Sequence, residues 1–452
     1  MNNPIKPPSP PPASQRGQIV DLSKVKNFLT NALMKGLETE KLPPDQRRQV
    51  AYTSLAQIYS RTGLQLGDDV RERLFREVLD ELIGYGPIQP LLDDPDISEV
   101  MVNGPKQVYV ERKGKVTLSD VCFENNEHVL RVIDRIVSPL GRLVDQDHPT
   151  VDGRLPDGSR VNAVVPPVAI DGPNITIRKF RKERMTIEQL VGYGSMTESM
   201  AEFLRACVVA RLNVIISGGT GSGKTTLLNI LSSFIPEDER IVTIEDAAEL
   251  QLQQEHVVRL ETKPPNPEGG GGCSIRDLVR NSLRMRPERI VVGECRGGEA
   301  LDMLQAMNTG HDGSLTTLHA NTPRDALSRL ETMCLMAGLD LPVKVVREQV
   351  ASAVDLIVQQ TRLRDGSRKV TQVTELAGME GDMVVLTDIF KFEQTGISPE
   401  GKVIGEMRPT GIRPLFSSKL EAAGFKLRPE VFGVNVAEML ANNRDRGRQQ
   451  RR

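Results

Sequence analysis

The residues with the clearest chemical meaning lie in a glycine-rich segment near the middle of the chain. Gly218, Gly223, Lys224 and Thr225 match the spacing G-x-x-x-x-G-K-T. Glycines let successive backbone N–H groups converge on phosphate oxygens, a lysine here reaches the β- and γ-phosphates, and the threonine hydroxyl is a ligand for Mg²⁺. The segment therefore predicts a site for a nucleotide and Mg²⁺. The expected contacts come from Gly219, Thr220, Gly221, Ser222, Gly223, Lys224, Thr225 and Thr226.

Apolar residues on both sides of this segment predict the elements that hold it. Leu212–Ile216 has the apolar run of a buried strand, and Leu227–Phe234 has the spacing of an amphipathic helix. A helix N-terminus adds partial positive charge at the end where phosphates would bind. The alternative is a glycine-rich turn that only joins a strand to a helix. The order strand, loop and helix, which phosphate binding requires, argues against that alternative.

Three later segments, each typical of a strand, are followed by polar residues. These residues are Glu245, Glu294 and His319. In a parallel sheet with crossover helices, ligands bind at the carboxyl ends of the strands. We therefore expect the three side chains to lie around the same nucleotide.

Each of these side chains has a chemical role available. A carboxylate can hold Mg²⁺ through water, and hydrolysis needs a residue that orients or deprotonates the attacking water. Glu245 and Glu294 are the candidates for these two roles, and their spacing leaves open which residue does which. His319 is expected to contact the γ-phosphate, the alternative being a structural histidine held by hydrogen bonds. His311 is a weaker candidate because it lies in a loop, and Cys295 is expected to be a small buried residue.

Arg154, Arg160 and Arg178 are a further candidate set, each beside an expected turn or strand end. Taken singly, each is best interpreted as a surface arginine. The alternative is that some of them face the phosphates of a bound nucleotide, because the planar guanidinium group matches phosphate oxygens in geometry and charge.

The pattern of composition and periodicity divides the 452 residues into six segments and predicts an α/β fold. In order, they are a proline-rich disordered arm (1–16), a helical bundle (17–86), a smaller α/β domain (87–185), a linker (186–196), a larger α/β domain (197–428) and a basic tail (429–452).

The composition argues against a membrane-spanning or nucleic-acid-binding protein. The formal charge of −2 gives no general attraction to nucleic acid, and the absence of Trp leaves few rings for base stacking. No apolar run approaches the roughly 20 residues of a membrane helix, and the first residues lack the apolar region of a signal peptide. Five scattered Cys without a C-x-x-C pair indicate free thiols in a reducing cytosol rather than a zinc site.

Four segments together resemble the secretion ATPase superfamily, whose members drive type II secretion, type IV pili and type IV secretion. They are the glycine-rich segment, I-E-D-A-A-E-L at 244–250, R-I-V-V-G-E-C-R at 289–296 and T-G-H-D-G-S-L-T-T-L-H-A-N at 309–321. In that family they are the Walker A motif, the Asp box, a Walker B motif with Glu in place of Asp, and the His box. The segments 91–104 and 151–162 resemble more specifically the CpaF-type branch, the ATPases of tight-adherence (Tad) pili.

The resemblance implies a RecA-like ATPase domain that works with the smaller N-terminal domain in a homo-hexamer. It implies hydrolysis of ATP with Mg²⁺, a cytoplasmic location at the inner membrane, docking on inner-membrane platform proteins and an indirect action on pilin. By the same resemblance, Glu245 positions the attacking water, Glu294 holds Mg²⁺ through water, and His319 links the γ-phosphate to subunit contacts. The arginines at 154, 160 and 178 would complete the site.

Three other functions remain open. A conjugation-type type IV secretion ATPase would use the same chemistry in another machine. A nucleotide-gated scaffold would bind ATP with little turnover. A DNA translocase on a RecA-like core is the third, and the near-neutral charge and scarce aromatic residues argue against it.

Overall fold

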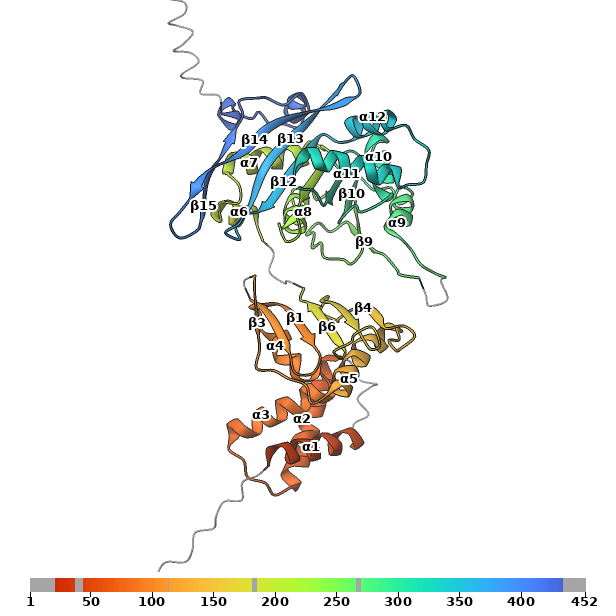
Figure 1. The fold of residues 1–452 in the computed structure, drawn as a ribbon, viewed down its shortest axis with the longest axis vertical. Helices are drawn as coiled ribbons and strands as arrows, with labels where there is room; N and C mark the ends of the chain where they lie inside the picture. The colour runs from red at the N-terminus through yellow and green to blue at the C-terminus, as the bar shows by residue number, and fades with distance from the viewer. Residues whose placement is uncertain (1–20, 37–43, 113, 181–184, 266–269, 434–452) are drawn as a thin grey trace, which may run out of the picture. The chain divides into compact units, whose positions relative to one another are not determined.

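The computed structural model describes residues 21–36, 44–112, 114–180, 185–265 and 270–433. The chain passes from one compact unit to a second between residues 180 and 181. In Figure 1 the first unit runs from red to yellow and the second from yellow-green to blue. The predicted arm (1–16) and the predicted tail from residue 434 lie outside the described residues. Within the described ranges, no helix combines the length and the apolar character needed to cross a membrane.

The described part of the first unit begins with three helices around a small apolar core. They are α1 (Leu22–Gly36), α2 (Pro44–Arg61) and α3 (Asp68–Leu82). Leu29, Leu33 and Leu55 are fully buried in this core, and the ring of Phe75 contacts two tyrosine rings edge to face. The apolar residues recur at helical spacing, so each helix has one face that must be covered.

An antiparallel sheet with the strand order β3-β2-β1-β6-β5-β4 follows the three helices. The elements are η2 (Gly86–Ile88), α4 (Gln89–Asp93), β1 (Ile97–Asn103), β2 (Val108–Arg112), β3 (Lys115–Leu118), α5 (Asn126–Val137), η3 (Ser138–Leu140), β4 (Thr150–Arg154), β5 (Arg160–Val164) and β6 (Asn174–Arg178). Val129, Val132 and Ile133 of α5 share one buried core with apolar residues of the sheet.

Polar contacts join the helical part of the first unit to its sheet part. The Nε2 atom of His128 on α5 lies 3.0 Å from Oε1 of Glu81 on α3. Arg135 donates through Nη1 to the carbonyl oxygens of Glu81 and Gly84. The predicted segments 17–86 and 87–185 therefore have separate apolar cores inside a single compact unit.

The second unit is built on a sheet with the strand order β15-β14-β13-β12-β7-β11-β10-β8-β9. The six strands β12, β7, β11, β10, β8 and β9 are paired in parallel. The strands β13, β14 and β15 are added to β12 by antiparallel pairing. Their bounds are β7 (Val214–Gly218), β8 (Ile241–Glu245), β9 (Val257–Glu261), β10 (Arg289–Val292), β11 (Leu315–Leu318), β12 (Leu356–Arg362), β13 (Arg368–Glu380), β14 (Met383–Ile397) and β15 (Val403–Pro409). The edge strands β9 and β15, which the sequence does not predict, contain no buried residue.

Helices lie on both faces of this sheet (Figure 1). Val214 and Ile216 of β7 point into a core shared with α7 and α8, whereas Ile215 points into a core shared with α10, α11 and α12. The helices are α6 (Ile187–Gly192), α7 (Glu198–Val209), α8 (Lys224–Ser232), α9 (Ile275–Ser282), α10 (Glu299–Asn308), α11 (Pro323–Leu335), α12 (Val343–Ala353) and α13 (Ser417–Ala422), with a turn at η4 (Pro429–Phe432). This three-layer arrangement confirms the predicted α/β fold with a RecA-like ATPase domain.

Part of the predicted linker, 186–196, is folded as helix α6 of the second unit. Thr186 caps this helix through a capping box with Gln189, and Leu190 is buried in the core. The carbonyl oxygen of Ser195 accepts a hydrogen bond from Val370 on β13. Residues 181–184 lie outside the described residues, so the extent of a linker stays a prediction.

Candidate nucleotide-binding site

Strand β7, the glycine-rich loop and helix α8 follow one another as the sequence predicts. All five residues of β7 are buried, and α8 begins at Lys224. Gly221 and Gly223 have φ angles of 69° and 99°, where any side chain would be strained. A Cβ atom on Gly218 would overlap the carbonyl oxygen of Gln360 on β12. The loop therefore requires glycine at these positions to adopt its conformation.

Lys224 lies on the first turn of α8 and reaches across the loop. Its Nζ donates to the carbonyl oxygen of Gly219 at 3.3 Å and lies 4.0 Å from Oε1 of Glu294. Burial lowers the pKa of Lys224, an effect that Glu294 opposes and Arg296 increases. The contact brings the loop's lysine to a carboxylate from a different strand.

The strands that precede the predicted polar residues lie next to one another in the order β7-β11-β10-β8. They are paired in parallel, so their carboxyl ends align at one edge of the sheet. Glu245 is the last residue of β8, His319 comes directly after β11, and Glu294 is the second residue after β10. The structure thus brings the three side chains to the edge where the phosphate loop begins.

Glu245 is a buried carboxyl group, 3% exposed. Its Oε2 accepts hydrogen bonds from the backbone N–H groups of Glu249 at 2.7 Å and Leu250 at 3.0 Å. Burial raises the pKa of Glu245 to about 6, although the two N–H groups oppose this shift. A Cβ atom on Gly293, at the end of β10, would lie 2.9 Å from Cγ of Glu245. The neighbouring strand therefore needs glycine here to accommodate the carboxylate.

Glu294 lies in a cationic environment instead. Its Oε2 accepts from Nε and Nη2 of Arg296 at 2.8 and 2.6 Å. Arg296 also reaches Asp246, which follows Glu245, at 3.2 Å. The arginine therefore bridges the ends of β8 and β10. The sequence gives no role to Arg296, and its place two residues after Glu294 is the signal that could have suggested one.

His319 is partly buried beside the same edge. Burial lowers its pKa, the positive charge of Lys224 lowers it further, and the carboxylate of Glu294 opposes the shift. Thr317 donates through Oγ1 to the carbonyl oxygen of Gly293 at 2.7 Å and links β11 to the end of β10. Cys295 is buried, as the sequence predicts, and burial raises the pKa of its thiol to about 12, which excludes it as a thiolate nucleophile.

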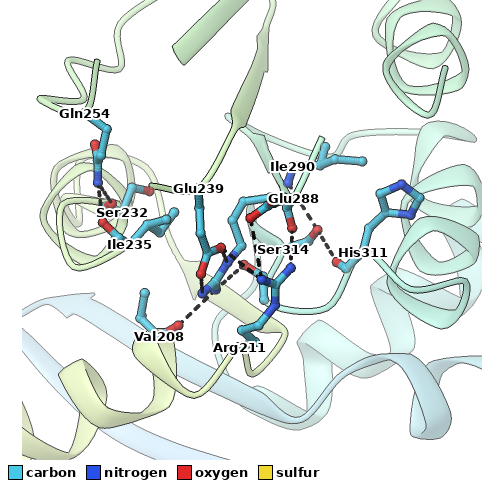
Figure 2. A network of polar contacts seen from close by, with 12 residues as sticks. Val208, Arg211, Ser232, Ile235, Glu239, Gln254, Glu288, Ile290, His311 and Ser314 are labelled. Carbon is cyan, nitrogen blue, oxygen red and sulfur yellow. Dashed lines mark hydrogen bonds and ion pairs between the residues drawn. The ribbon is translucent and has the colours of Figure 1, made fainter. Parts of the chain in front are cut away.

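A buried polar network lies at the opposite, amino-terminal edge of these strands (Figure 2). Arg289, the first residue of β10, is completely buried and donates through Nε and Nη2 to the carboxylate of Glu239. Its Nη1 donates to the carbonyl oxygens of Val208 and Gly313. Arg211 adds a second cation 3.3 Å from Glu239. This network fixes the start of β10 to the end of α7 and to the loop before β11.

His311 belongs to the amino-terminal edge and not to the edge with the phosphate loop (Figure 2). Its carbonyl oxygen accepts a hydrogen bond from the hydroxyl of Ser314, which lies just before β11. The two histidines of this segment are therefore at opposite ends of one strand, and His319 is the one beside Lys224.

Comparison with known proteins identifies the family. Residues 81–394 match the family described as Type II/IV secretion system protein. The chain belongs to this family. It is therefore a member of the secretion ATPase superfamily, as the four motifs predict.

Similar proteins in this family include conjugal transfer proteins. A putative conjugal transfer protein of Mycobacterium tuberculosis is 37% identical over 71% of this chain and 93% of its own length. Conjugal transfer protein TrbB of Rhizobium radiobacter is 36% identical over 68% of this chain and 91% of its own length. The crystal structure of the VirB11 ATPase from the Brucella suis type IV secretion system, in complex with sulphate, is 31% identical; it covers 64% of this chain and 92% of that one, with a TM-score of 0.36.

In this secretion ATPase, Arg154, Arg160 and Arg178 form one row across the sheet of the first unit. Arg154 pairs with Arg160 and Arg160 pairs with Arg178 on the neighbouring strands β4, β5 and β6. Residues that are directly opposite share a face, so three positive charges gather there. Arg178 donates through Nε to Glu99 at 2.7 Å. A shared role of these arginines with the phosphate loop stays a prediction.

The residues around the phosphate loop of this secretion ATPase fit a nucleoside triphosphate with Mg²⁺. The hydroxyl of Ser222 is buried and has no hydrogen-bond partner among the described residues. Thr225 and Thr226 occupy the first turn of α8, directly after Lys224. The hydroxyl of Thr225 and the carboxylate of Glu294 are oxygen ligands of the kind that Mg²⁺ prefers. The donor set is therefore suitable for the predicted cofactors.

Proposed function

We propose that this secretion ATPase hydrolyses ATP and uses the energy to drive a machine in the cell envelope. The main observation behind the proposal is that a phosphate loop and two carboxylates in different surroundings lie at the same edge of one sheet. Glu294 lies 4.0 Å from Lys224, and Glu245 ends a neighbouring strand of the same sheet. Phosphate binding needs the loop alone, whereas hydrolysis also needs groups for Mg²⁺ and for the attacking water.

Glu245 has the role of positioning and deprotonating the attacking water. With a pKa of about 6, the group is mostly ionised at neutral pH yet basic enough to accept a proton. The imidazole of His319 donates a hydrogen bond to the γ-phosphate. Lys224 and the N–H groups of the loop hold the β- and γ-phosphates in place.

Thr225 and Glu294 have the role of holding Mg²⁺, with Glu294 acting through a water molecule. A bound Mg²⁺ neutralises charge on the β- and γ-phosphates. Arg296 orients Glu294 through the two hydrogen bonds to its Oε2. Arg154, Arg160 and Arg178 supply further positive charge for the nucleotide.

The machine that we propose is a Tad-type pilus. The resemblance of the segments 91–104 and 151–162 to the CpaF-type branch supports this choice. The protein then works as a homo-hexamer at the cytoplasmic face of the inner membrane, docks on platform proteins and moves pilin indirectly. Membership of the type II/IV secretion family supports this setting.

A conjugation-type secretion ATPase is the second candidate. The names of two similar proteins, a putative conjugal transfer protein and the conjugal transfer protein TrbB, favour it. The chemistry of the site is the same in both cases, so the two candidates differ in partners and not in catalysis.

A phosphate-release assay tests the enzymatic part of the proposal. The wild-type chain is expected to release phosphate from ATP only when Mg²⁺ is present, and Lys224→Ala is expected to reduce the rate by about 100-fold or more. Lys263→Ala, an exposed lysine of the same unit, is the matched control and should keep the wild-type rate. A wild-type chain that binds ATP without turnover would contradict the motor and favour a nucleotide-gated scaffold.

Replacement of the gene in its own organism tests the choice of machine. Cells that carry Lys224→Ala should lose surface pili and keep any conjugal DNA transfer. The opposite result, with pili intact and DNA transfer lost, would overturn the pilus assignment in favour of conjugation. Pilin and membrane-platform genes beside this gene would support the first result.

A further inference from the structure

The hairpin formed by β12 and β13 places two arginines against the phosphate loop. Arg362 ends β12, Arg368 begins β13, and the two residues are directly opposite each other in the hairpin. Arg368 donates through Nε to the carbonyl oxygen of Gly221 at 2.8 Å. Nη1 of Arg362 lies 3.7 Å from the position that a Cβ atom on Gly221 would take. Both guanidinium groups therefore lie at the loop that the proposed function assigns to phosphates.

The pairing of two like charges at this position has a cost. Like charges that are directly opposite in a hairpin destabilise it, unless an anion lies close by. Arg362 is exposed, and among the residues that the structure describes no carboxylate forms an ion pair with it. The phosphate chain of a nucleotide in the loop would supply a negative charge for Arg362.

Contacts away from the loop hold the hairpin in position. Asp365 lies in the turn of the hairpin, and its Oδ1 accepts hydrogen bonds from the N–H and hydroxyl groups of Ser367. Its Oδ2 accepts a hydrogen bond from the N–H group of Val403 on β15. Lys369 donates through Nζ to the carbonyl oxygen of Gly194, just after α6. The fold of the second unit therefore sets where the two arginines lie.

The strand order and the contact of Lys224 indicate which end of a nucleotide would face this hairpin. In the sheet, β12 lies on one side of β7, and β11, β10 and β8 lie on the other. Lys224 contacts Glu294 on the latter side, so the γ-phosphate belongs there. The phosphate chain then runs over the loop, and the α-phosphate comes to lie on the β12 side. The hairpin is thus a neighbour of the α-phosphate and not of the reacting group.

We propose that Arg362 binds the α-phosphate of the nucleotide and that Arg368 is a positioning residue that holds the carbonyl group of Gly221. This inference rests on the proposed nucleotide-binding function. It adds an arginine site on the far side of the loop from the two carboxylates. ATP and ADP share the α-phosphate, so Arg362 should contribute equally to the binding of both.

Titration calorimetry of the full chain with Mg-ADP and with the Mg complex of adenylyl imidodiphosphate tests Arg362. Arg362→Gln is expected to weaken both ligands by the same factor, about tenfold, because one charge-assisted hydrogen bond is lost. Arg364→Gln removes the same charge from the same exposed hairpin turn and should bind both ligands like the wild type. In the ATPase assay, Arg362→Gln should raise KM about tenfold and leave kcat unchanged.

Three results would overturn the assignment of Arg362. Unchanged affinity for both ligands would show that it does not touch the nucleotide. A loss of affinity for the triphosphate analogue alone, together with a lower kcat, would place Arg362 at the γ-phosphate. A loss with adenine nucleotides that is absent with Mg-GDP would place it at the base.

Arg368 is tested by comparing Arg368→Gln with Arg368→Lys. The glutamine variant should raise KM for ATP with little change in kcat, because the loop loses its outer support. The lysine variant keeps a cationic donor for the Gly221 carbonyl and should recover most of the affinity. Equal effects of the two variants, or an equal fall in kcat, would refute a positioning role for Arg368.

Failure of this inference can be told apart from failure of the proposed function. Binding is measured without turnover, and Lys224→Ala serves as the variant that loses binding at the loop. A wild type that binds Mg-ADP but never hydrolyses ATP contradicts the motor and still allows the test of Arg362. A wild type that is active while Arg362→Gln binds normally contradicts only the assignment of Arg362.

Discussion

Glu245 and Glu294 lie at the carboxyl ends of the neighbouring strands β8 and β10 but in contrasting surroundings. Glu245 is buried and accepts two backbone N–H groups, whereas Glu294 is nearer to solvent and accepts from the guanidinium group of Arg296. Burial favours the neutral form of a carboxyl group, and a nearby cation favours the ionised form. The surroundings therefore distinguish two residues that have the same chemistry in the sequence.

The raised pKa of Glu245 predicts a fall of activity in acid. The proton-accepting form is the carboxylate, and burial moves its pKa upward from 4.5 to about 6. The protonated, inactive form therefore accumulates as the pH falls through about 6. We expect kcat/KM for ATP to fall about tenfold per pH unit below that point. Steady-state rates from about pH 5 to about pH 8 in buffers of constant ionic strength measure this.

The variant Glu245→Gln directly tests whether Glu245 accepts the proton of the attacking water. It should reduce kcat by roughly 10²- to 10⁴-fold, keep the binding of Mg-ADP and lose the step near pH 6. Glu237→Gln changes an exposed carboxylate of the same unit and should keep both the rate and the profile. If Glu245→Gln kept the wild-type pH dependence, another group would be responsible for the titration.

Site residues that belong to a short sequence motif could be predicted from the sequence. Site residues that reach the loop only through the pairing of distant strands could not. Lys224 belongs to a short motif whose spacing carries its chemistry. Arg362 and Arg368 are more than a hundred residues away and reach the loop only because β12 pairs with β7. No local pattern reports such a contact. Arg296 is intermediate, because it lies in a recognised segment but acts through a bridge to Asp246.

At the scale of elements, the amino-terminal ends of the strands are fixed by the network around Arg289. Its guanidinium group has no exposed surface, and its partners come from α7, the loop before β8 and the loop before β11. A Cβ atom on Gly313 would overlap this guanidinium group, so the loop is shaped around it. The network holds the strands whose other ends carry Glu245, Glu294 and His319.

Removal of this guanidinium group should destabilise the second unit strongly. We expect Arg289→Met to lower the free energy of unfolding by about 2–4 kcal/mol, because the buried carboxylate of Glu239 loses both hydrogen bonds from Arg289 and keeps only Arg211 as a cationic partner. Urea unfolding followed through hydrogen exchange of the amides of β8 and β10 measures this change.

Two further variants test whether the loss of the network around Arg289 causes the expected loss of stability. Arg284→Met removes an exposed arginine of the same unit and should change stability by less than about 0.5 kcal/mol. The double variant Arg289→Met with Glu239→Gln should regain part of the loss, since the buried charge is then gone. An Arg289→Met chain as stable as the wild type would show that burial of the ion pair costs as much as the pair contributes.

The elements themselves were predictable where burial is strong. The central strands β7, β8, β10 and β11 are buried at every position, and their short segments rich in Val, Ile, Leu and Thr are typical of buried strands. The edge strands β9 and β15 contain only partly buried and exposed residues, so their pattern does not differ from that of a loop. The helix α6 was not predicted either, because a short segment with glycines at 192 and 194 is typical of a linker.

At the scale of the whole molecule, the chain consists of two units that each have their own apolar cores. The cores of the second unit hold the phosphate loop from both faces of its sheet. The cores of the first unit belong to its helices and to its antiparallel sheet. The helical and sheet segments of the first unit form one compact body.

The location of the loop between the two cores of the second unit leads to a prediction about ligand binding and stability. A ligand that binds only the native state adds RT ln(1 + [L]/Kd) to the free energy of unfolding, which is about 2.7 kcal/mol at a concentration of about 100 Kd. Mg-ADP at that concentration should therefore raise the melting temperature of the second unit by about 5–10 °C in scanning calorimetry. Lys224→Ala should lose the shift, because the proposed function assigns the binding of the phosphates to the ammonium group of Lys224, while Arg364→Gln should keep it. A full shift in Lys224→Ala would mean that ADP stabilises the chain from a site other than the phosphate loop.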